Sequence, residues 1–133
     1  MREIKFRAVR LDTGEWIYGD LHLHTPFPHI HSTRGDKAKI DTKNIGQFTG
    51  LRDKNGKDIY EGDIVVQHWG SPHYRNGVYY DCNARIGSVE FHESGSFLLF
   101  SCGNLYRLLG DGLTQEVQGN IHDNPELLNR ENK

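Results

Sequence analysis

Residues 47–60 read Gln47-Phe48-Thr49-Gly50-Leu51-Arg52-Asp53-Lys54-Asn55-Gly56-Lys57-Asp58-Ile59-Tyr60 and carry the strongest structural signal in the sequence. Apolar and aromatic residues flank a polar centre, which is typical of two short strands joined by a tight turn. The Asn55-Gly56 pair predicts a type I′ turn, because both residues tolerate a positive φ and the twist of that turn suits paired strands. The surrounding fold is therefore expected to be antiparallel β.

Strand patterns continue on both sides of this hairpin. Upstream, residues 4–10 alternate, turn at Asp12-Thr13-Gly14 and return over residues 15–19, which places Trp16 and Tyr18 on one face and Ile17 on the other. Residues 69–83 are rich in Gly, Pro, Asn, His and Tyr and predict a long loop. After the central hairpin, further strands are predicted at residues 64–66, 86–91, 97–100, 105–109 and 116–121.

Length and composition indicate one folded domain. The chain has 133 residues with 15 glycines and few alanines, which disfavours long helices. A short C-terminal helix is expected, since Asn124 is a good N-cap and Pro125 suits the first helical position. We predict a mainly β protein (β-rich α+β), with residues 1–133 forming one small antiparallel domain that is partly closed like a barrel.

Charge and cysteine content indicate a cytoplasmic protein. Sixteen Lys and Arg against 18 Asp and Glu give a net charge of −2, so no strong overall field draws the chain to nucleic acid or a membrane. No apolar run approaches the roughly 20 residues of a membrane span, and residues 1–10 lack the apolar core of a secretion signal. Cys82 and Cys102 are expected to be reduced thiols packed as small hydrophobes.

Four of the 8 histidines lie in two His-x-His pairs within residues 21–31. Residues two apart in a strand point to the same side, so each pair could present two imidazoles to one ion. Neutral imidazole suits Zn²⁺ or Ni²⁺, which makes a metal site at His22, His24, His29 and His31 one hypothesis. The plainer alternative is a set of solvated histidines on an exposed, proline-interrupted segment, with no cofactor.

No familiar catalytic motif is present. The chain has no P-loop, no HExxH and no GxSxG sequence. Glu61 and Asp63 could form a carboxylate pair, but capping of a turn between two strands is the better interpretation. Cys82 has no recognised nucleophile signature around it. An enzyme is therefore not the favoured interpretation.

An aromatic and basic segment is the candidate binding element, with Trp69, Tyr74, Arg75 and Tyr79 as its principal residues. Aromatic residues mixed with cations can stack the bases of single-stranded nucleic acid. The cations here are few, however, and amphipathic aromatics suit a protein interface equally well. We favour the protein interface.

Three segments are similar to the YopX proteins, a family of small proteins encoded in bacteriophages and prophages. They are residues 2–8, residues 46–65 around the central hairpin, and the closing Gly119-Asn120-Ile121-His122-Asp123-Asn124-Pro125-Glu126-Leu127-Leu128. Where the family start usually continues with tryptophan, this chain has Val9. The resemblance implies a mainly β, soluble, intracellular protein that self-associates. It implies no known reaction.

The functional prediction is a non-enzymatic phage or prophage accessory protein that works by binding. We expect a homo-oligomer, with an unidentified phage or host protein as a further partner. Two alternatives remain open at this point. One is a metal-dependent enzyme built on the histidine cluster, and the other is a small nucleic-acid-binding β-barrel.

Overall fold

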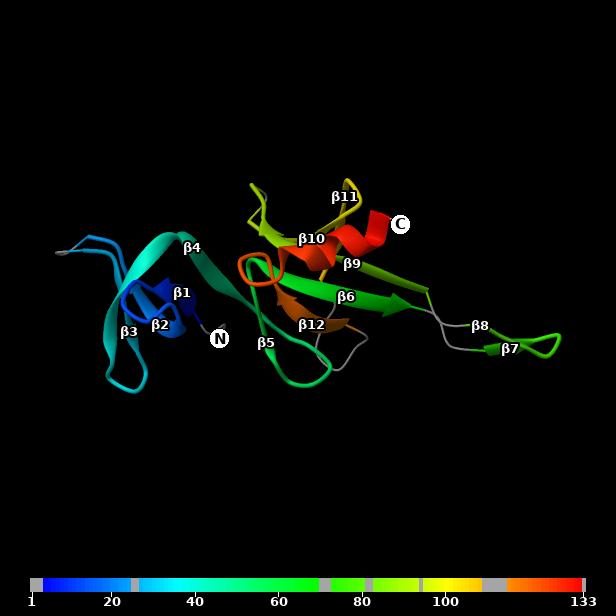
Figure 1. Cartoon of the computed structure of the whole chain (residues 1–133), viewed down its shortest axis with the longest axis horizontal. Coiled ribbons are helices and arrows are strands. Elements are labelled where there is room, and N and C mark those ends of the chain that lie inside the picture. Colours follow the sequence, from blue (N-terminus) through cyan, green and yellow to red (C-terminus); the bar gives the residue numbers. More distant parts are fainter. Residues whose placement is uncertain are drawn as a thin grey trace. The chain divides into compact units, whose positions relative to one another are not determined.

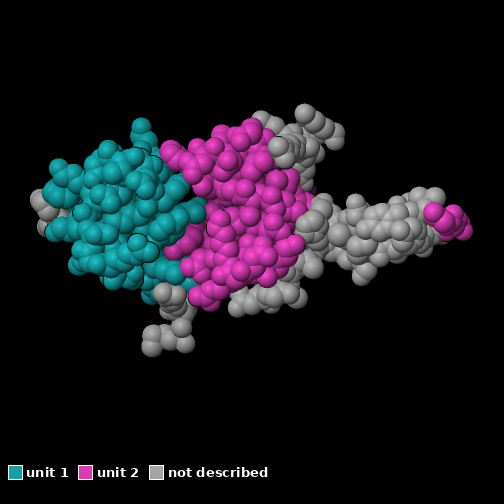
Figure 2. Space-filling model, turned by 60° about the horizontal axis from the view of Figure 1, so that its bottom comes forward, with its two compact units in different colours: residues 1–50 teal, residues 51–133 magenta. Residues whose placement is uncertain are grey.

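The computed structural model describes residues 4–24, 27–69, 73–80, 83–93, 95–108 and 115–132. The chain forms two compact units, residues 1–50 and residues 51–133 (Figure 2). Antiparallel sheets dominate both units (Figure 1), so the prediction of a mainly β, antiparallel fold is confirmed. The prediction of a single domain over residues 1–133 stays a prediction.

The first unit is a small closed ring of strands. Its strands are β1 (Phe6–Arg10), β2 (Trp16–His22), β3 (His29–Ser32) and β4 (Lys37–Arg52), whose last two residues belong to the second unit. Neighbours in this order pair antiparallel, and β4 pairs back with β1. The register shift between Arg7 and Val9 marks a bulge where β1 meets β4, and bulges supply the bend that closure needs. The predicted partly closed barrel is confirmed.

Apolar side chains at alternate strand positions fill the interior of this ring. Ile17 is buried while Tyr18 beside it is 45% exposed, as the period of two predicts. Leu21, Ile30 and Ala38 lie opposite one another on three neighbouring strands and point to the same side. The interior residues of the ring are Ala8, Ile17, Ile30, Ala38 and Ile40, with Phe6, Leu21 and Ile45 against them.

A glycine allows two strands of the ring to approach closely. Gly19 lies opposite Ser32 in the β2–β3 register. A Cβ atom at this position would collide with the main-chain oxygen of His31 and with Cα of Ser32. Only glycine leaves room for the β3 backbone here, so this residue is required by packing rather than by turn chemistry.

The second unit is built on a five-stranded antiparallel sheet in the order β11-β10-β9-β6-β12. A separate two-stranded sheet pairs β7 with β8, and β5 (Asp58–Tyr60) pairs with β4. The remaining bounds are β6 (Asp63–Trp69), β7 (His73–Arg75), β8 (Val78–Tyr80), β9 (Asn83–Phe91), β10 (Phe97–Ser101), β11 (Asn104–Arg107) and β12 (Gln115–Asn120).

The core of the second unit lies against one face of this sheet. Its buried residues are Ile59, Val65, Val89, Phe97 and Leu99. The predicted C-terminal helix is confirmed as η1 (Pro125–Asn132), and it is a 3₁₀-helix. Within the described part of the chain, no helix has the length and apolar content needed to traverse a bilayer.

The turn at Asn55-Gly56 differs from its prediction. Gly56 has φ +81°, but Asn55 does not have a positive φ, so the turn is not type I′. The amide of Gly56 donates to Asp53 O, and the amide of Asp53 donates to Lys57 O, which closes a three-residue loop with glycine in the left-handed position. The side chain of Asp53 causes the difference, because it accepts the Asn55 amide and holds that residue in a right-handed turn.

The predicted long loop at residues 69–83 is wrong for residues 69, 73–80 and 83, whereas residues 70–72 and 81–82 lie outside the described residues. Strand β6 extends to Trp69, β9 begins at Asn83, and β7 and β8 form a hairpin between them. Asn76 and Gly77 at its tip have φ +53° and +80°, the pair of positive values that a type I′ turn requires. The sequence also gave no expectation of β3, because Pro26 and Pro28 interrupt the pattern before it.

Candidate functional site

Strands β2 and β3 position three of the four predicted metal-binding histidines. His22 lies directly opposite His29, and His31 lies opposite Asp20. Opposed residues of an antiparallel pair share a face, so His22, His29 and His31 lie on the outer face of the ring, away from Leu21 and Ile30. His24 lies beyond the end of β2 and is exposed. The histidines of the two pairs are therefore only partly brought together.

The rings of His22 and His29 stack face to face. Their centroids are 4.8 Å apart and their planes differ by 8°. Nδ1 of His29 lies 3.0 Å from the carbonyl oxygen of Phe27, which makes Nδ1 the donor and leaves the lone pair on Nε2 of the neutral ring. Imidazole lone pairs lie in the ring plane, so two stacked parallel rings direct them along separate planes and not at one ion.

No three His, Cys, Asp or Glu side chains form a metal-binding group among the residues that the structure describes. His29 is buried, whereas His22, His24 and His31 are exposed. The prediction of a zinc or nickel site stays a prediction. Its geometric support is limited to the orientation of the His29 ring.

Two lysines of β4 lie opposite histidines of β3. His31 lies opposite Lys37, and His29 lies opposite Lys39. The Lys39 ammonium lies 4.4 Å from the centroid of the Phe27 ring, which also contacts His29 edge-on at 5.8 Å. We call this surface the cationic face; it consists of His22, Phe27, His29, His31, Lys37 and Lys39.

An open depression of about 440 Å³ borders the cationic face. Phe27, Leu11 and Ala38 form its apolar lining, with Lys37 and Lys39 beside them. Asp12 also lines it, but both oxygens of that carboxylate accept hydrogen bonds from Arg10 at 2.9 Å. This ion pair, with its hydrogen bonds as the main cause, lowers the pKa of Asp12 and raises that of Arg10.

The candidate interface residues of the second unit lie in the β6–β9 and β7–β8 ribbons. Trp69 is the last residue of β6 and lies opposite Asn83. Tyr74 lies opposite Tyr79, and Arg75 lies opposite Val78. The hairpin thus brings the predicted tyrosines to directly opposed backbone positions. Sequence reasoning missed this arrangement, although Asn76-Gly77 is a typical hairpin turn signal.

Asp53, in the central hairpin, has a structural role. It is 3% exposed, and its carboxylate accepts the amides of Asn55, Lys57 and Val117 at 2.9, 2.9 and 3.0 Å. Burial raises the pKa of Asp53, but these three main-chain donors outweigh burial and hold it below its usual value. The carboxylate therefore joins the hairpin turn to β12, 64 positions away.

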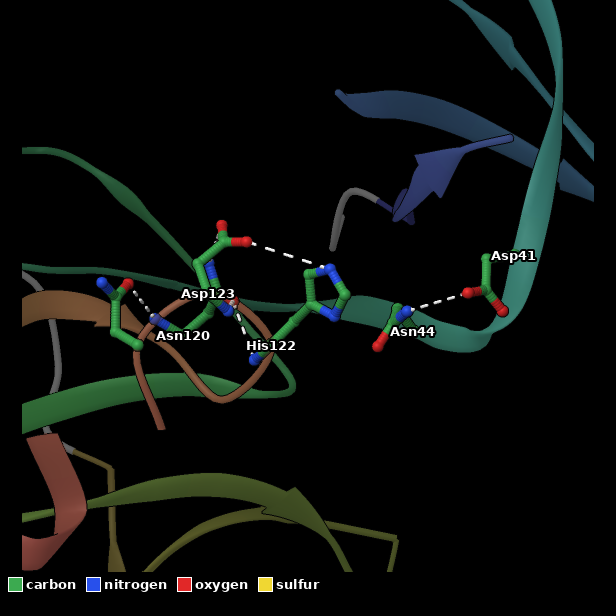
Figure 3. A network of polar contacts seen from close by, with 6 residues as sticks. Asp41, Asn44, Asn120, His122 and Asp123 are labelled. Atoms are coloured by element: carbon green, nitrogen blue, oxygen red, sulfur yellow. Dashed lines mark hydrogen bonds and ion pairs between the residues drawn. The ribbon is translucent and has the colours of Figure 1, made fainter. Parts of the chain in front are cut away.

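Asp63 caps a turn in the same way. It is 2% exposed and accepts the amide of Tyr60 at 2.8 Å, which agrees with the turn-capping interpretation. In the closing segment, Asn120 Oδ1 accepts the amides of His122 and Asp123 at 3.0 and 2.8 Å (Figure 3). Figure 3 also shows Asn44 of the first unit donating to Asp41 at 3.3 Å. Asp63 and Asn120 thus order local turns, whereas Asp41 and Asn44 lie within β4.

Of the two cysteines, the structure describes Cys102. Cys102 is exposed in the Cys102-Gly103 turn between β10 and β11, so its expected packing as a small hydrophobe is wrong. It has φ +48°, and Gly103 has φ +81°. A side chain at the tip of such a turn projects into solvent. Cys82 lies outside the described residues.

The family comparison agrees with the three sequence segments. The model of the family described as YopX protein matches residues 5–129. The chain therefore belongs to the YopX family. No curated protein matches it.

A solved structure shares the fold. The crystal structure of protein EF1440 from Enterococcus faecalis is similar, with a TM-score of 0.55 and 24% sequence identity. The match covers 96% of this chain and 99% of that chain. The similarity therefore extends over both units, and at this identity it concerns the fold alone.

Proposed function

We propose that this protein is a non-enzymatic accessory protein of phage or prophage origin that acts by binding and self-associates through the β7–β8 hairpin. The observation that carries the proposal is the isolation of this hairpin. Among the described strands, β7 and β8 pair only with each other. A two-stranded ribbon alone is marginally stable in water, and three or more strands are normally needed.

Pairing with a second copy would meet that need. When two antiparallel hairpins join edge to edge around a two-fold axis, each supplies the same edge to the other, and a four-stranded sheet results. Tyr74, Tyr79 and Tyr80 lie in the hairpin, and tyrosine is favoured both in strands and at protein interfaces. This supports a second copy as the occupant.

The main polar residues of the family segments support a binding role over catalysis. Asp53, Asp63 and Asn120 each accept main-chain amides at turns. Side chains engaged in this way stabilise the fold and supply no acid, base or nucleophile to a substrate. The shared segments are then explained by the shape of the protein.

Light scattering over a range of concentrations tests this proposal. The informative variant replaces residues 70–82 with Asn-Gly, a two-residue turn that preserves the Trp69–Asn83 register. We expect the wild-type mass to rise from 15.3 kDa towards twice that value, while the variant stays monomeric. A wild-type protein that is monomeric at all concentrations, or a variant that associates equally well, would contradict the proposal.

A further inference from the structure

Two lysines of the cationic face have no carboxylate partner within the described part of the chain. Lys37 and Lys39 are exposed and form no ion pair with a carboxylate among the described residues. In the second unit, by contrast, Arg52 pairs with Asp58 and Lys54 pairs with Glu116. Cations held side by side without counter-charges repel one another, so an anionic ligand would relieve that repulsion.

The distribution of charge between the units is also uneven. Residues 1–50 contain eight Lys and Arg against six Asp and Glu, together with four histidines. Residues 51–133 contain eight Lys and Arg against twelve Asp and Glu. The net charge of the whole chain conceals a first unit that favours anions. The cationic face is built on two sets of opposed residues, Asp20-His31-Lys37 and His22-His29-Lys39, and Asp20 is the only acidic residue among them.

The depression beside the cationic face adds an aromatic element. Phe27 and Leu11 offer an apolar lining, Lys37 and Lys39 line the same depression, and the Lys39 ammonium lies 4.4 Å from the centroid of the Phe27 ring. An aromatic surface next to cations is the combination that binds single strands, because bases stack on the ring while phosphates meet the cations. An acidic peptide would use the lysines but supplies no base to stack on Phe27.

A second depression repeats this combination on the same unit. It also measures about 440 Å³, and Trp16 and Tyr18 line it together with Arg34, with Asp36 and with Arg10, which is paired with Asp12. Both depressions draw residues from the segment 32–39, which ends β3 and begins β4. Because the segment 32–39 lines both depressions, and both contain aromatic and cationic residues, they fit a ligand of several nucleotides better than a single nucleotide.

We propose that the cationic face of the first unit binds single-stranded nucleic acid, with Lys37 and Lys39 contacting phosphates and Phe27 stacking a base. This site is distinct from the residues 69–83 for which sequence reasoning weighed nucleic acid. It is also separate from the hairpin proposed for self-association, so each proposal can fail alone.

Fluorescence anisotropy with a labelled 20-nucleotide oligothymidine tests the site. The full chain is compared with Lys37→Gln/Lys39→Gln and with a matched control, Lys54→Gln/Lys57→Gln, which removes the same charge from exposed positions of the second unit. We expect the first pair to weaken binding at least about tenfold and to reduce the slope of log Kd against log salt by about 1.4, at roughly 0.7 per phosphate contact on single strands. The control pair should change Kd less than about twofold.

A second pair of variants examines stacking. Phe27→Ala should weaken binding at least about fivefold, since base stacking on an aromatic ring contributes about that factor or more. Phe100→Ala, at a residue 40% exposed in the second unit, is its control. Three results would overturn the proposal: no binding of the oligonucleotide by the wild-type chain, equal losses in both lysine pairs, or equal displacement by polyglutamate and by unlabelled oligonucleotide. The last result would indicate an acidic protein partner.

Discussion

Replacement of Asp53 is expected to destabilise the second unit strongly. In Asp53→Ala, the amides of Asn55, Lys57 and Val117 lose their acceptor. Asn55 and Lys57 are exposed, so water can replace the carboxylate at about 0.5–1 kcal/mol each, whereas the half-buried Val117 amide costs about 1–3 kcal/mol. We expect the free energy of unfolding to fall by about 2–5 kcal/mol, measured by urea denaturation at pH 7.

The pH dependence of the stability loss shows how much of it comes from the charge of the Asp53 carboxylate. The folded-state pKa of Asp53 is lowered, so its ionised form contributes stability above the unfolded-state value, about 3.9, and this contribution is lost as the pH falls from there through the folded-state pKa. Asp53→Asn keeps one acceptor oxygen and should lose less stability than Asp53→Ala at pH 7. The gap between wild type and Asp53→Asn should narrow below about pH 4.

Asp12→Ala is the matched control, because Asp12 is exposed and pairs with Arg10 two residues away. Surface pairs of this kind contribute little, so the urea midpoint should hardly change. The reasoning is refuted if Asp53→Ala unfolds at the same urea concentration as wild type. A gap between wild type and Asp53→Asn that is constant from pH 7 to pH 3 would refute the role of the charge.

Three further predictions follow from individual positions. Gly19→Ala should lower the free energy of unfolding by about 2–3 kcal/mol, because the added Cβ collides with the β3 backbone. Its control is Gly14→Ala, which should cost only about 1–2 kcal/mol, because Gly14 has φ +77° and open space around it. Equal losses of stability in urea denaturation would contradict the close approach of β2 and β3 at Gly19. Gly77→Val and Gly56→Val place the same strain at turns with φ +80° and +81°. Light scattering should show weaker self-association for the Gly77 variant alone, and an equal effect of both would argue against the hairpin. Elemental analysis of tag-free protein should find zinc and nickel well below one equivalent, since the stacked His22 and His29 rings do not converge; a stoichiometric metal would show that the histidines rearrange to bind it.

Local patterns predicted most of the strands because their signal is local. Alternation marked β1, β2 and β9 correctly, since the side-chain period of two follows from the pleat of each strand alone, and short apolar runs marked β6 and β10. β3 was not predicted, because it is only four residues long and depends on pairing with β2 and β4. The cationic face could not be predicted for the same reason, since its residues come together only when β2, β3 and β4 pair in register.

The two Asn-Gly pairs show where local chemistry ends and tertiary structure begins. Each pair marks a hairpin, as its tolerance of positive φ requires, yet Asn76-Gly77 forms a type I′ turn and Asn55-Gly56 does not. The difference arises from Asp53, whose carboxylate is held by the amide of Val117 as well as by its own turn. The sequence by itself thus determined that the chain is a series of antiparallel strands with turns at its glycines. Closure of β4 onto β1, the stacking of His22 on His29 and the link from Asp53 to β12 were decided by tertiary structure, because each needs segments far apart in the chain to come into contact.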